Sequence, residues 1–330
     1  MNQDWSGRRV LVTGAAGFLG SHLTEQLLAR GATVRALVRY TSHGRAGWLE
    51  PARSTATLEI VAADITDRAM LARVMKGVDT VFHLAALIGI PYSYDAPSSY
   101  VRVNVEGTEA VLQAARTAGV TRLVHTSTSE VYGTASQLPM PETHPLNAQS
   151  PYAASKIGAD MMALSFHRAF ELPVVIVRPF NAYGPRQSSR AVIATTIVQA
   201  LTRSVVSLGH VEPTRDFTFV ADTVEGFLAA GLAGKGAEGR VFNLGNGEEI
   251  SIGALAAKII ALIGRKVVVE ADPRRVRPAG SEVDRLCADA SEAKRVLGWS
   301  PRVSLDDGLT RTIEWCQANL ARFRPEEYSV

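Results

Sequence analysis

Hydrophobic residues fall in short continuous runs separated by stretches with helical periodicity. Such runs cover residues 10–13, 33–38, 58–62, 80–84, 122–126 and 174–177. An apolar run of this length is typical of a strand buried on both faces of a parallel sheet. Helical patterns end near residue 30 and cover residues 99–118 and about 152–170. Strands alternating with helices at this spacing predict a doubly wound, parallel α/β sheet.

The pattern loosens after residue 178, where prolines, glycines and arginines recur between short elements. We expect helices near residues 193–203 and 221–233, a strand at 241–244, a helix at 252–263 and a last helix at 305–320. Ser251 is a suitable N-cap for the helix at 252–263, and Gly264 a suitable stop. The chain is therefore expected to form a larger domain over residues 1–180 and a smaller, interleaved α/β domain over residues 181–330.

A glycine-rich turn joins the first strand to the first helix. Glycine lets the backbone turn tightly and approach a pyrophosphate, whose charge then faces the helix N-terminus. The strand before the turn and the helix after it supply the context that this motif requires. We therefore predict a Rossmann-like dinucleotide site whose turn residues are Gly14, Gly17, Phe18, Leu19 and Gly20.

The ends of the later strands supply further candidates for cofactor contacts. The second strand ends in Arg39 rather than an acid, so Arg39 could face the 2′-phosphate of NADP or be a solvated surface residue. Asp64 could bond the adenine amino group or only cap the next helix. Small residues after the fourth strand would let a cofactor lie against the backbone. Besides Arg39 and Asp64, the candidates for cofactor contacts near the strand ends are Ile65, Leu84, Ala85, Ala86 and Thr126.

A tyrosine and a lysine four residues apart lie on one face of the helix that begins after Ser150 and Pro151. Ser150 is placed to cap this helix, and Pro151 suits its first turn. A nearby ammonium favours the phenolate, so we expect Lys156 to lower the pKa of Tyr152 and make it a usable base. The spacing alone is common on solvated helix faces, so the prediction depends on the nucleotide motif that precedes it.

The amino-acid composition excludes only a few classes of protein. Hydrophobic residues make up 46% and charged residues 20% of the 330 residues, with a net charge of +3. This is ordinary for a globular protein and compatible with an anionic small substrate, and no basic stripe interleaved with aromatic residues indicates nucleic acid. The two cysteines, Cys287 and Cys316, lack the spacing of a thiolate metal site, and three histidines lack it too: His83, His125 and His167. We expect no metal site.

The N-terminal residues are polar and lead directly into a strand, without the pattern of a secretory signal. The longest apolar stretch, residues 81–90, is too short to span a bilayer. We expect a cytoplasmic protein without membrane contacts.

Taken together, these motifs resemble the nucleotide-sugar branch of the extended short-chain dehydrogenase/reductase family, over nearly the whole chain. The resemblance rests on the glycine turn, Asp64, residues 84–86, Asn104, residues 126–133, the Tyr152/Lys156 pair and residues 178–185. Three stretches, 86–94, 125–133 and 213–217, are similar to NAD-dependent 4,6-dehydratases that act on nucleotide-activated N-acetylglucosamine, the legionaminic acid type. The resemblance therefore implies NAD as cofactor, against the NADP alternative raised by Arg39.

The resemblance also implies catalytic roles. Tyr152 would act as base at the sugar 4-hydroxyl while hydride passes from C4 to the nicotinamide, and Lys156 would hold the phenolate and the nicotinamide ribose. Thr128 would bond the 4-oxygen, and Glu130 would take the C5 proton before water is eliminated. Alternatively, Thr128 bonds only backbone and Glu130 is a structural carboxylate held by amides.

Ser129 is a departure, since many sugar 4,6-dehydratases carry aspartate there to protonate the departing 6-hydroxyl. Either Glu130 serves both steps or the reaction differs. Relatives that decarboxylate UDP-glucuronate also carry serine and glutamate at these positions, and a 4-epimerase needs only oxidation, rotation of the ketone and reduction. A non-catalytic nucleotide-binding sensor or scaffold is the alternative from a different class, although such proteins usually lack the Tyr/Lys pair.

The resemblance implies that the second half binds a nucleotide-diphosphate sugar. The candidates for its diphosphate are Asn181, Arg186, Arg215 and Arg277, and those for the sugar are Tyr92 and Tyr94. The helices at 99–118 and 152–170 would pair with their copies in a homodimer. The apolar residues Met161, Met162, Leu164 and Phe166 fit this pairing, and equally fit burial within one chain.

Overall fold

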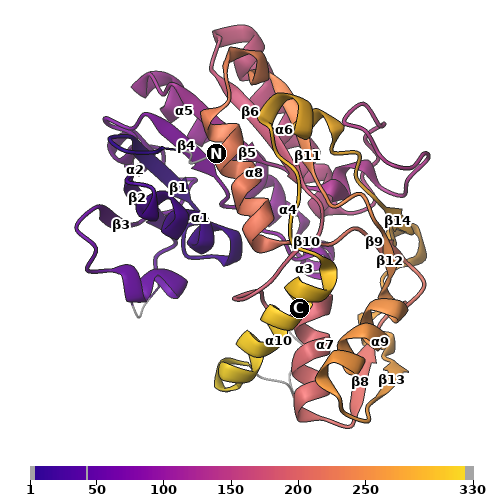
Figure 1. Ribbon diagram of the computed structural model, residues 1–330. Coiled ribbons are helices and arrows are strands. Elements are labelled where there is room, and N and C mark those ends of the chain that lie inside the picture. Colours follow the sequence, from indigo (N-terminus) through magenta and orange to yellow (C-terminus); the bar gives the residue numbers. More distant parts are fainter. Residues whose placement is uncertain (1–3, 42–43, 324–330) are drawn as a thin grey trace.

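The computed structural model in Figure 1 describes residues 4–41 and 44–323 and is built around one seven-stranded parallel sheet. Its strand order is β11-β6-β5-β4-β1-β2-β3. The strands are β1 (Arg9–Thr13), β2 (Thr33–Val38), β3 (Leu58–Ala62), β4 (Thr80–His83), β5 (Arg122–Thr126), β6 (Val174–Pro179) and β11 (Arg240–Leu244). The order reverses direction at β1 and β4, so the predicted doubly wound, Rossmann-like sheet is confirmed.

Successive residues of a strand point to opposite faces of the sheet, so apolar side chains lie on both faces and helices cover each of them. Val10 and Val12 pack in the core under α1 (Phe18–Ala29) and α8 (Val220–Leu232), whereas Leu11 packs in the core on the other face. That second face is covered by α2 (Arg68–Val74), α5 (Gly107–Ala118) and α6 (Pro151–Phe170). Burial on both faces explains why these strands read as continuous apolar runs.

The second half of the chain contributes to the central sheet and also forms a separate lobe. β11 pairs in parallel with β6, and α8 lies against the sheet. The lobe, in the lower part of Figure 1, contains α7 (Val192–Thr202), α9 (Ile252–Ile263) and α10 (Leu305–Ala318). It also holds the parallel pair β8 (Val205–Leu208) and β13 (Val268–Ala271). The division at residue 180 remains a prediction.

Short strands connect the lobe to the sheet. β9 (Thr214–Arg215) lies between β12 (Ile250–Ser251) and β14 (Arg285–Leu286), and β7 (Ala182–Tyr183) pairs with β10 (Thr218–Phe219). These pairs, together with β8 and β13, were not predicted, because strands this short carry little periodicity. They bring residues 214–216 next to residues 284–288, far apart in the sequence.

The helix expected at 99–118 is interrupted. α4 (Pro97–Tyr100) leads into a π-helical segment, Val101–Glu106, before α5 begins. Such widened turns occur often at functional sites, and this one presents Asn104 inward. The short helix α3 (Ile90–Asp95) was not predicted, and α2, the helix expected after Asp64, was predicted without bounds.

The helix ends predicted from the sequence are confirmed. The hydroxyls of Ser150 and Ser251 each accept a hydrogen bond from the amide three residues on, and Gly264 ends α9 with φ +72°. Within the described residues, no helix has both the length and the apolar character needed to cross a membrane.

Candidate active site

The glycine turn after β1 packs backbone against backbone. Gly14 has φ +68°, and a Cβ placed there would lie 2.8 Å from the amide nitrogen of Ala85 in the loop after β4. A Cβ at Gly20 would lie 2.2 Å from the carbonyl oxygen of Gly14. A side chain at either position would collide with this backbone, so glycine is required for the tight turn that leads into the helix N-terminus, where a pyrophosphate could bind.

The other cofactor candidates lie at the same edge of the sheet, where the parallel strands end. The Thr13 hydroxyl accepts hydrogen bonds from the amides of Leu84 and Ala85, both at 3.1 Å, and so joins the loops after β1 and β4. Ala86 follows in the same loop and is half-buried, Ile65 is buried after β3, and Thr126 ends β5. The phenyl of Phe18 and the side chain of Leu19 pack partly against the core.

Asp64 does not cap α2, since the N-cap is Asp67. Instead one Asp64 carboxylate oxygen accepts hydrogen bonds from the amide and the hydroxyl of Thr66, at 2.8 and 2.7 Å. These bonds, outweighing partial burial, lower the pKa of Asp64, and the nearby charge of Arg39 acts in the same direction. The Arg39 side chain is exposed at this edge.

Asn104 connects the loop after β4 to α6. Its side-chain oxygen accepts from the amide of Leu87 at 2.8 Å, and its amide group donates to the Leu87 carbonyl and to the Ser155 hydroxyl, both at 2.9 Å. Ser155 in turn donates to the Tyr152 carbonyl at 2.7 Å. Asn104, 1% exposed, therefore positions the helix that carries the Tyr/Lys pair against the loop expected to contact the cofactor.

Tyr152 is 7% exposed and packs against Ile90 and Tyr100. Burial raises its pKa, a hydrogen bond with Thr128 acts in the opposite direction, and the charge of Glu130 adds to the rise. The prediction that Lys156 lowers the pKa of Tyr152 is therefore wrong for the ligand-free protein. The Lys156 ammonium instead donates to the Thr126 carbonyl at 2.6 Å, which directs it to the end of β5.

Lys156 lies next to a buried group of charged side chains that was not predicted from the sequence. Burial lowers its pKa to about 8, against the attraction of the Asp160 carboxylate. Asp160, fully buried, accepts hydrogen bonds from Ser127 at 2.7 Å and from Arg178 at 2.9 and 3.2 Å, and His125 Nε2 lies 3.3 Å away. Burial raises the pKa of Asp160, but these partners prevail and lower it, so the carboxylate is ionised beneath the site.

The residues after β5 form a single 3₁₀ turn, Ser129–Tyr132. The Thr128 hydroxyl accepts from the Glu130 amide at 3.3 Å, and the nearness of Thr128 to the Tyr152 phenol opposes the rise in the pKa of Tyr152. Ser129 is 3% exposed, whereas Glu130 is half-buried. The Glu130 charge raises the pKa of Tyr152 and opposes the lowering of the pKa of Arg215, so this carboxylate lies near both side chains.

The substrate candidates fall into separate places. Arg215, 6% exposed, and Arg277 both pair with the carboxylate of Glu282, and the side-chain nitrogen of Asn181 is buried without a partner. Arg186 instead donates to Ser21 and Glu25 of α1, at 3.2 and 2.9 Å, which ties it to the nucleotide-binding half.

The two tyrosines proposed for the sugar lie in α3 and differ in exposure. The hydroxyl of Tyr94 shares a hydrogen bond of 2.6 Å with Ser281 of the lobe, while Tyr92 is 43% exposed. Tyr94 therefore spans the space between the two halves of the chain.

The histidines show no sign of metal ligation. His83 bonds the hydroxyls of Thr13 and Thr108, and His167 bonds the carbonyl of Leu172. Within the described residues, no three histidine, cysteine, aspartate or glutamate side chains are grouped closely enough to hold a metal ion.

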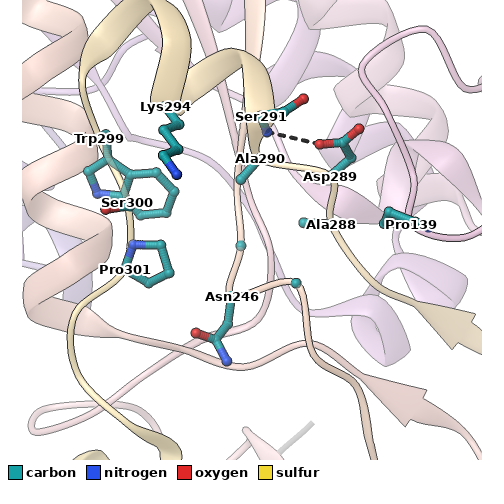
Figure 2. Close-up of a pocket in the computed structure, with 12 residues that line it drawn as sticks. Pro139, Asn246, Ala288, Asp289, Ala290, Ser291, Lys294, Trp299, Ser300 and Pro301 are labelled. Atoms are coloured by element: carbon teal, nitrogen blue, oxygen red, sulfur yellow. Dashed lines mark hydrogen bonds between the residues drawn. The ribbon is translucent and has the colours of Figure 1, made fainter.

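A cleft of about 280 Å³ lies beside the loop after β11 (Figure 2). Asn246, Lys294 and the ring of Trp299 line it, together with residues 288–291. The indole N–H of Trp299 donates to the Asp222 carbonyl, which fixes the ring as part of the wall. None of the catalytic or cofactor candidates lines this cleft.

Known proteins of one family are similar to this chain over most of its length. Residues 11–312 match the profile described as GDP-mannose 4,6 dehydratase. The UDP-glucose 4-epimerase of Mycolicibacterium smegmatis is 38% identical over 93% of this chain and 98% of its own length. The UDP-glucuronic acid decarboxylase 2 of Arabidopsis thaliana is 34% identical over 92% of this chain and 67% of its own.

A solved structure from the same group of enzymes has a fold similar to that of this chain. The dTDP-glucose 4,6-dehydratase DesIV of Streptomyces venezuelae, crystallised with NAD bound, superposes with a TM-score of 0.87. It is 35% identical, and the match covers 96% of this chain and 99% of that one. The chain thus belongs to the extended short-chain dehydrogenase/reductase family, as a nucleotide-sugar enzyme of the dehydratase, decarboxylase and epimerase group.

Proposed function

We propose that the protein is an NAD-dependent nucleotide-sugar 4,6-dehydratase that forms a 4-keto-6-deoxy sugar. The observation that carries the proposal is the position of Glu130, a half-buried carboxylate whose charge acts on Tyr152 and Arg215. A 4-epimerase needs no second base, but elimination of water needs one at C5. The resemblance to dehydratases of the legionaminic acid type makes nucleotide-activated N-acetylglucosamine the first substrate to test.

The residues at the carboxyl edge of the sheet fit a dinucleotide. Gly14 and Gly20 keep the backbone open at the N-terminus of α1, and Asp64 keeps one carboxylate oxygen free of the Thr66 bonds. Exposed Arg39 would lie beside the adenosine ribose, and the structural neighbours that hold NAD favour NAD over NADP. NAD would supply a hydride acceptor and a positive ring beside the phenol.

Tyr152, Thr128 and Lys156 would handle the proton at the sugar 4-oxygen. The phenol is protonated in the ligand-free protein because burial raises its pKa, so a cation bound beside it is needed to make it a base. Thr128 lies near the phenol and lowers its pKa, so its hydroxyl would orient the same 4-oxygen. Lys156, held by the Thr126 carbonyl, would bond the ribose of the nucleotide.

Glu130 would then remove the proton at C5, which a neighbouring ketone acidifies. Ser129 is a weak acid and is 3% exposed, so it is a poor donor for the departing hydroxyl. We therefore assign both steps to Glu130: it takes the C5 proton as a carboxylate and returns a proton to the 6-oxygen as a carboxylic acid. Atoms balance: the C5 proton leaves with the 6-hydroxyl as water, one solvent-derived proton is delivered to C5 when the double bond is reduced, and the 4-hydroxyl proton taken by Tyr152 returns to solvent.

The diphosphate would lie against Arg215 and Arg277, with the unpartnered amide nitrogen of Asn181 as a donor. Tyr92 and Tyr94 would face the sugar. Arg186 fits this role less well, because its contacts with α1 direct it to the nucleotide-binding half.

Decarboxylation of UDP-glucuronate is the second candidate, since it needs no leaving hydroxyl and Ser129 would then be sufficient. Among the relatives are a decarboxylase and an epimerase as well as dehydratases.

We also propose a homodimer. Val101, Met161 and Phe170 expose apolar surface along the π-helical segment and α6, at 51%, 43% and 43%. Phe166 is buried, and Met162 and Leu164 pack against the same core, so of the four apolar residues named from the sequence only Met161 is available for a partner copy. Light scattering on the eluted protein tests the proposal, and a monomer at micromolar concentration would contradict it.

The test of function is mass spectrometry of products formed in deuterated water. The panel begins with UDP- and GDP-N-acetylglucosamine and UDP-glucuronate. Loss of water with one deuteron gained supports the dehydratase. Loss of carbon dioxide from UDP-glucuronate would establish the decarboxylase instead, and a new isomer of unchanged mass would establish an epimerase.

A further inference from the structure

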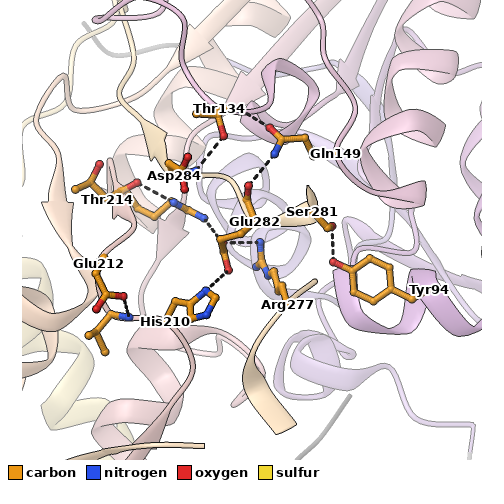
Figure 3. Close-up of polar contacts among 12 residues, drawn as sticks. Tyr94, Thr134, Gln149, His210, Glu212, Thr214, Arg277, Ser281, Glu282 and Asp284 are labelled. Atoms are coloured by element: carbon orange, nitrogen blue, oxygen red, sulfur yellow. Dashed lines mark hydrogen bonds and ion pairs between the residues drawn. The ribbon is translucent and has the colours of Figure 1, made fainter. Parts of the chain in front are cut away.

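Glu282 places a carboxylate among the cations expected to bind the substrate diphosphate (Figure 3). Its Oε1 lies 3.2 Å from Arg215 Nη2 and 3.6 Å from Arg277 Nη1. Its Oε2 lies 3.7 Å from Nδ1 of His210 at the outer side of the group. One carboxylate thus pairs with both guanidinium groups at once.

This ion-pair group is largely removed from water. The side chains of Arg215 and Glu282 are 8% and 13% exposed, so their attraction is screened less than that of a surface pair. Burial and the neighbouring Arg277 charge lower the pKa of Arg215, while Glu130 and Glu282 oppose this. Without a counter-ion the two guanidinium groups would repel each other, and Glu282 supplies the negative charge that a phosphate would otherwise bring.

The backbone around Glu282 is held on several sides. Its carbonyl accepts from Gln149 Nε2 at 2.7 Å, and the amide of Asp284 donates to the Thr134 hydroxyl at 3.1 Å. The hydroxyl of Ser281, the residue before Glu282, shares a hydrogen bond with the Tyr94 hydroxyl. These backbone hydrogen bonds do not involve the Glu282 carboxylate, so the side chain can rotate away while the segment stays in place.

We infer that Glu282 is an internal counter-ion, which occupies Arg215 and Arg277 until the diphosphate of a nucleotide sugar displaces it. The inference rests on the proposed function, which assigns the diphosphate to these arginines. Carboxylate and phosphate oxygens compete for the same guanidinium donors, so only one can hold them at a time. The affinity for nucleotide is therefore lowered by the ion pairs that must break, which also favours product release.

The test is isothermal titration of UDP and of GDP into the wild-type protein and Glu282→Gln. The amide keeps the shape but lacks the charge, so we expect it to bind whichever nucleotide the wild type binds with a Kd lowered by about tenfold, or about 1.4 kcal/mol. Glu212→Gln is the matched control, because exposed Glu212 lies in the same region and bonds the Val211 amide rather than an arginine. It should leave Kd unchanged.

Thermal unfolding shows whether the variant is folded. The change in melting temperature on adding nucleotide also measures the competition between Glu282 and the nucleotide. Ligand-free Glu282→Gln should melt below the wild type, and nucleotide should raise its melting temperature by more than it raises that of the wild type. Equal nucleotide affinity in both proteins would overturn the inference, as would weaker binding by Glu282→Gln, which would make Glu282 a direct acceptor for the ligand. If neither protein binds UDP or GDP, the proposed diphosphate site itself fails, and the inference with it.

Discussion

Lys156 is a buried cation, and its replacement should make the ligand-free protein more stable while abolishing turnover. Its side chain is 4% exposed, and its ammonium donates to the Thr126 carbonyl. Methionine has a similar length and no charge, so Lys156→Met tests the cost of burying the ammonium without leaving a large cavity. Active sites commonly hold such groups at the expense of stability.

The size of the effect follows from the pKa. Burial lowers the pKa of Lys156 from 10.5 to about 8, and each unit corresponds to about 1.4 kcal/mol. At pH 7, where Lys156 is charged in both states, its burial therefore costs about 3 kcal/mol. The variant leaves the Thr126 carbonyl without this donor, which costs about 1 kcal/mol. We expect Lys156→Met to raise the free energy of unfolding by about 2 kcal/mol.

The pH dependence has a defined sign. Between pH 8 and 10.5 the unfolded chain binds the lysine proton and the folded chain does not, so wild-type stability rises with pH across this window relative to the variant. Urea titrations of nucleotide-free protein at several pH values measure this difference. Lys294→Met, at an exposed position, is the control and should change little. A variant less stable than the wild type at pH 7, or a difference independent of pH, would refute the reasoning.

Three further substitutions test the site. Tyr152→Phe removes only the phenol oxygen, so turnover should fall by about 10²–10⁴-fold while calorimetry shows unchanged nucleotide binding; retained turnover would exclude Tyr152 as the base. Glu130→Gln should slow elimination by a similar factor, about 10²–10⁴-fold, and let reduced nicotinamide accumulate, seen by its absorbance; a normal rate without accumulation would contradict its role. Asn104→Ala leaves the buried Leu87 amide without its partner, so urea unfolding should show a loss of about 1–3 kcal/mol, and an unchanged midpoint would count against its anchoring role.

The central sheet and the nucleotide turn could be predicted from the sequence because their signals are local. Continuous apolar runs reflect burial on both faces, and the glycine at position 20 reflects the close approach of the Gly14 carbonyl within the same turn. The lobe was predicted less well. β9 and β14 are two residues long and are defined by the pairing of Thr214 with Arg285 and of Arg215 with Leu286, a relation between distant positions that no local pattern contains.

The polar interior of the site was also only partly predictable. Asp160 follows Lys156 by one helical turn, a spacing that could have indicated a shared face. Its partners His125 and Arg178 come from β5 and β6 and meet it only because those strands are neighbours in the sheet. The resemblance identified the stretch containing Arg178 but not its role. The pKa of Tyr152 depends on burial, which the Tyr-x-x-x-Lys spacing does not report.

The most direct test of the account uses a nucleotide sugar that the protein turns over, labelled with deuterium at C4. The account predicts that the deuterium reappears at C6 of the product within the same molecule, and that C5 carries a hydrogen from solvent delivered through Glu130. NMR of the product locates both. Deuterium found again at C4, or C5 without solvent hydrogen, would contradict transient oxidation followed by elimination.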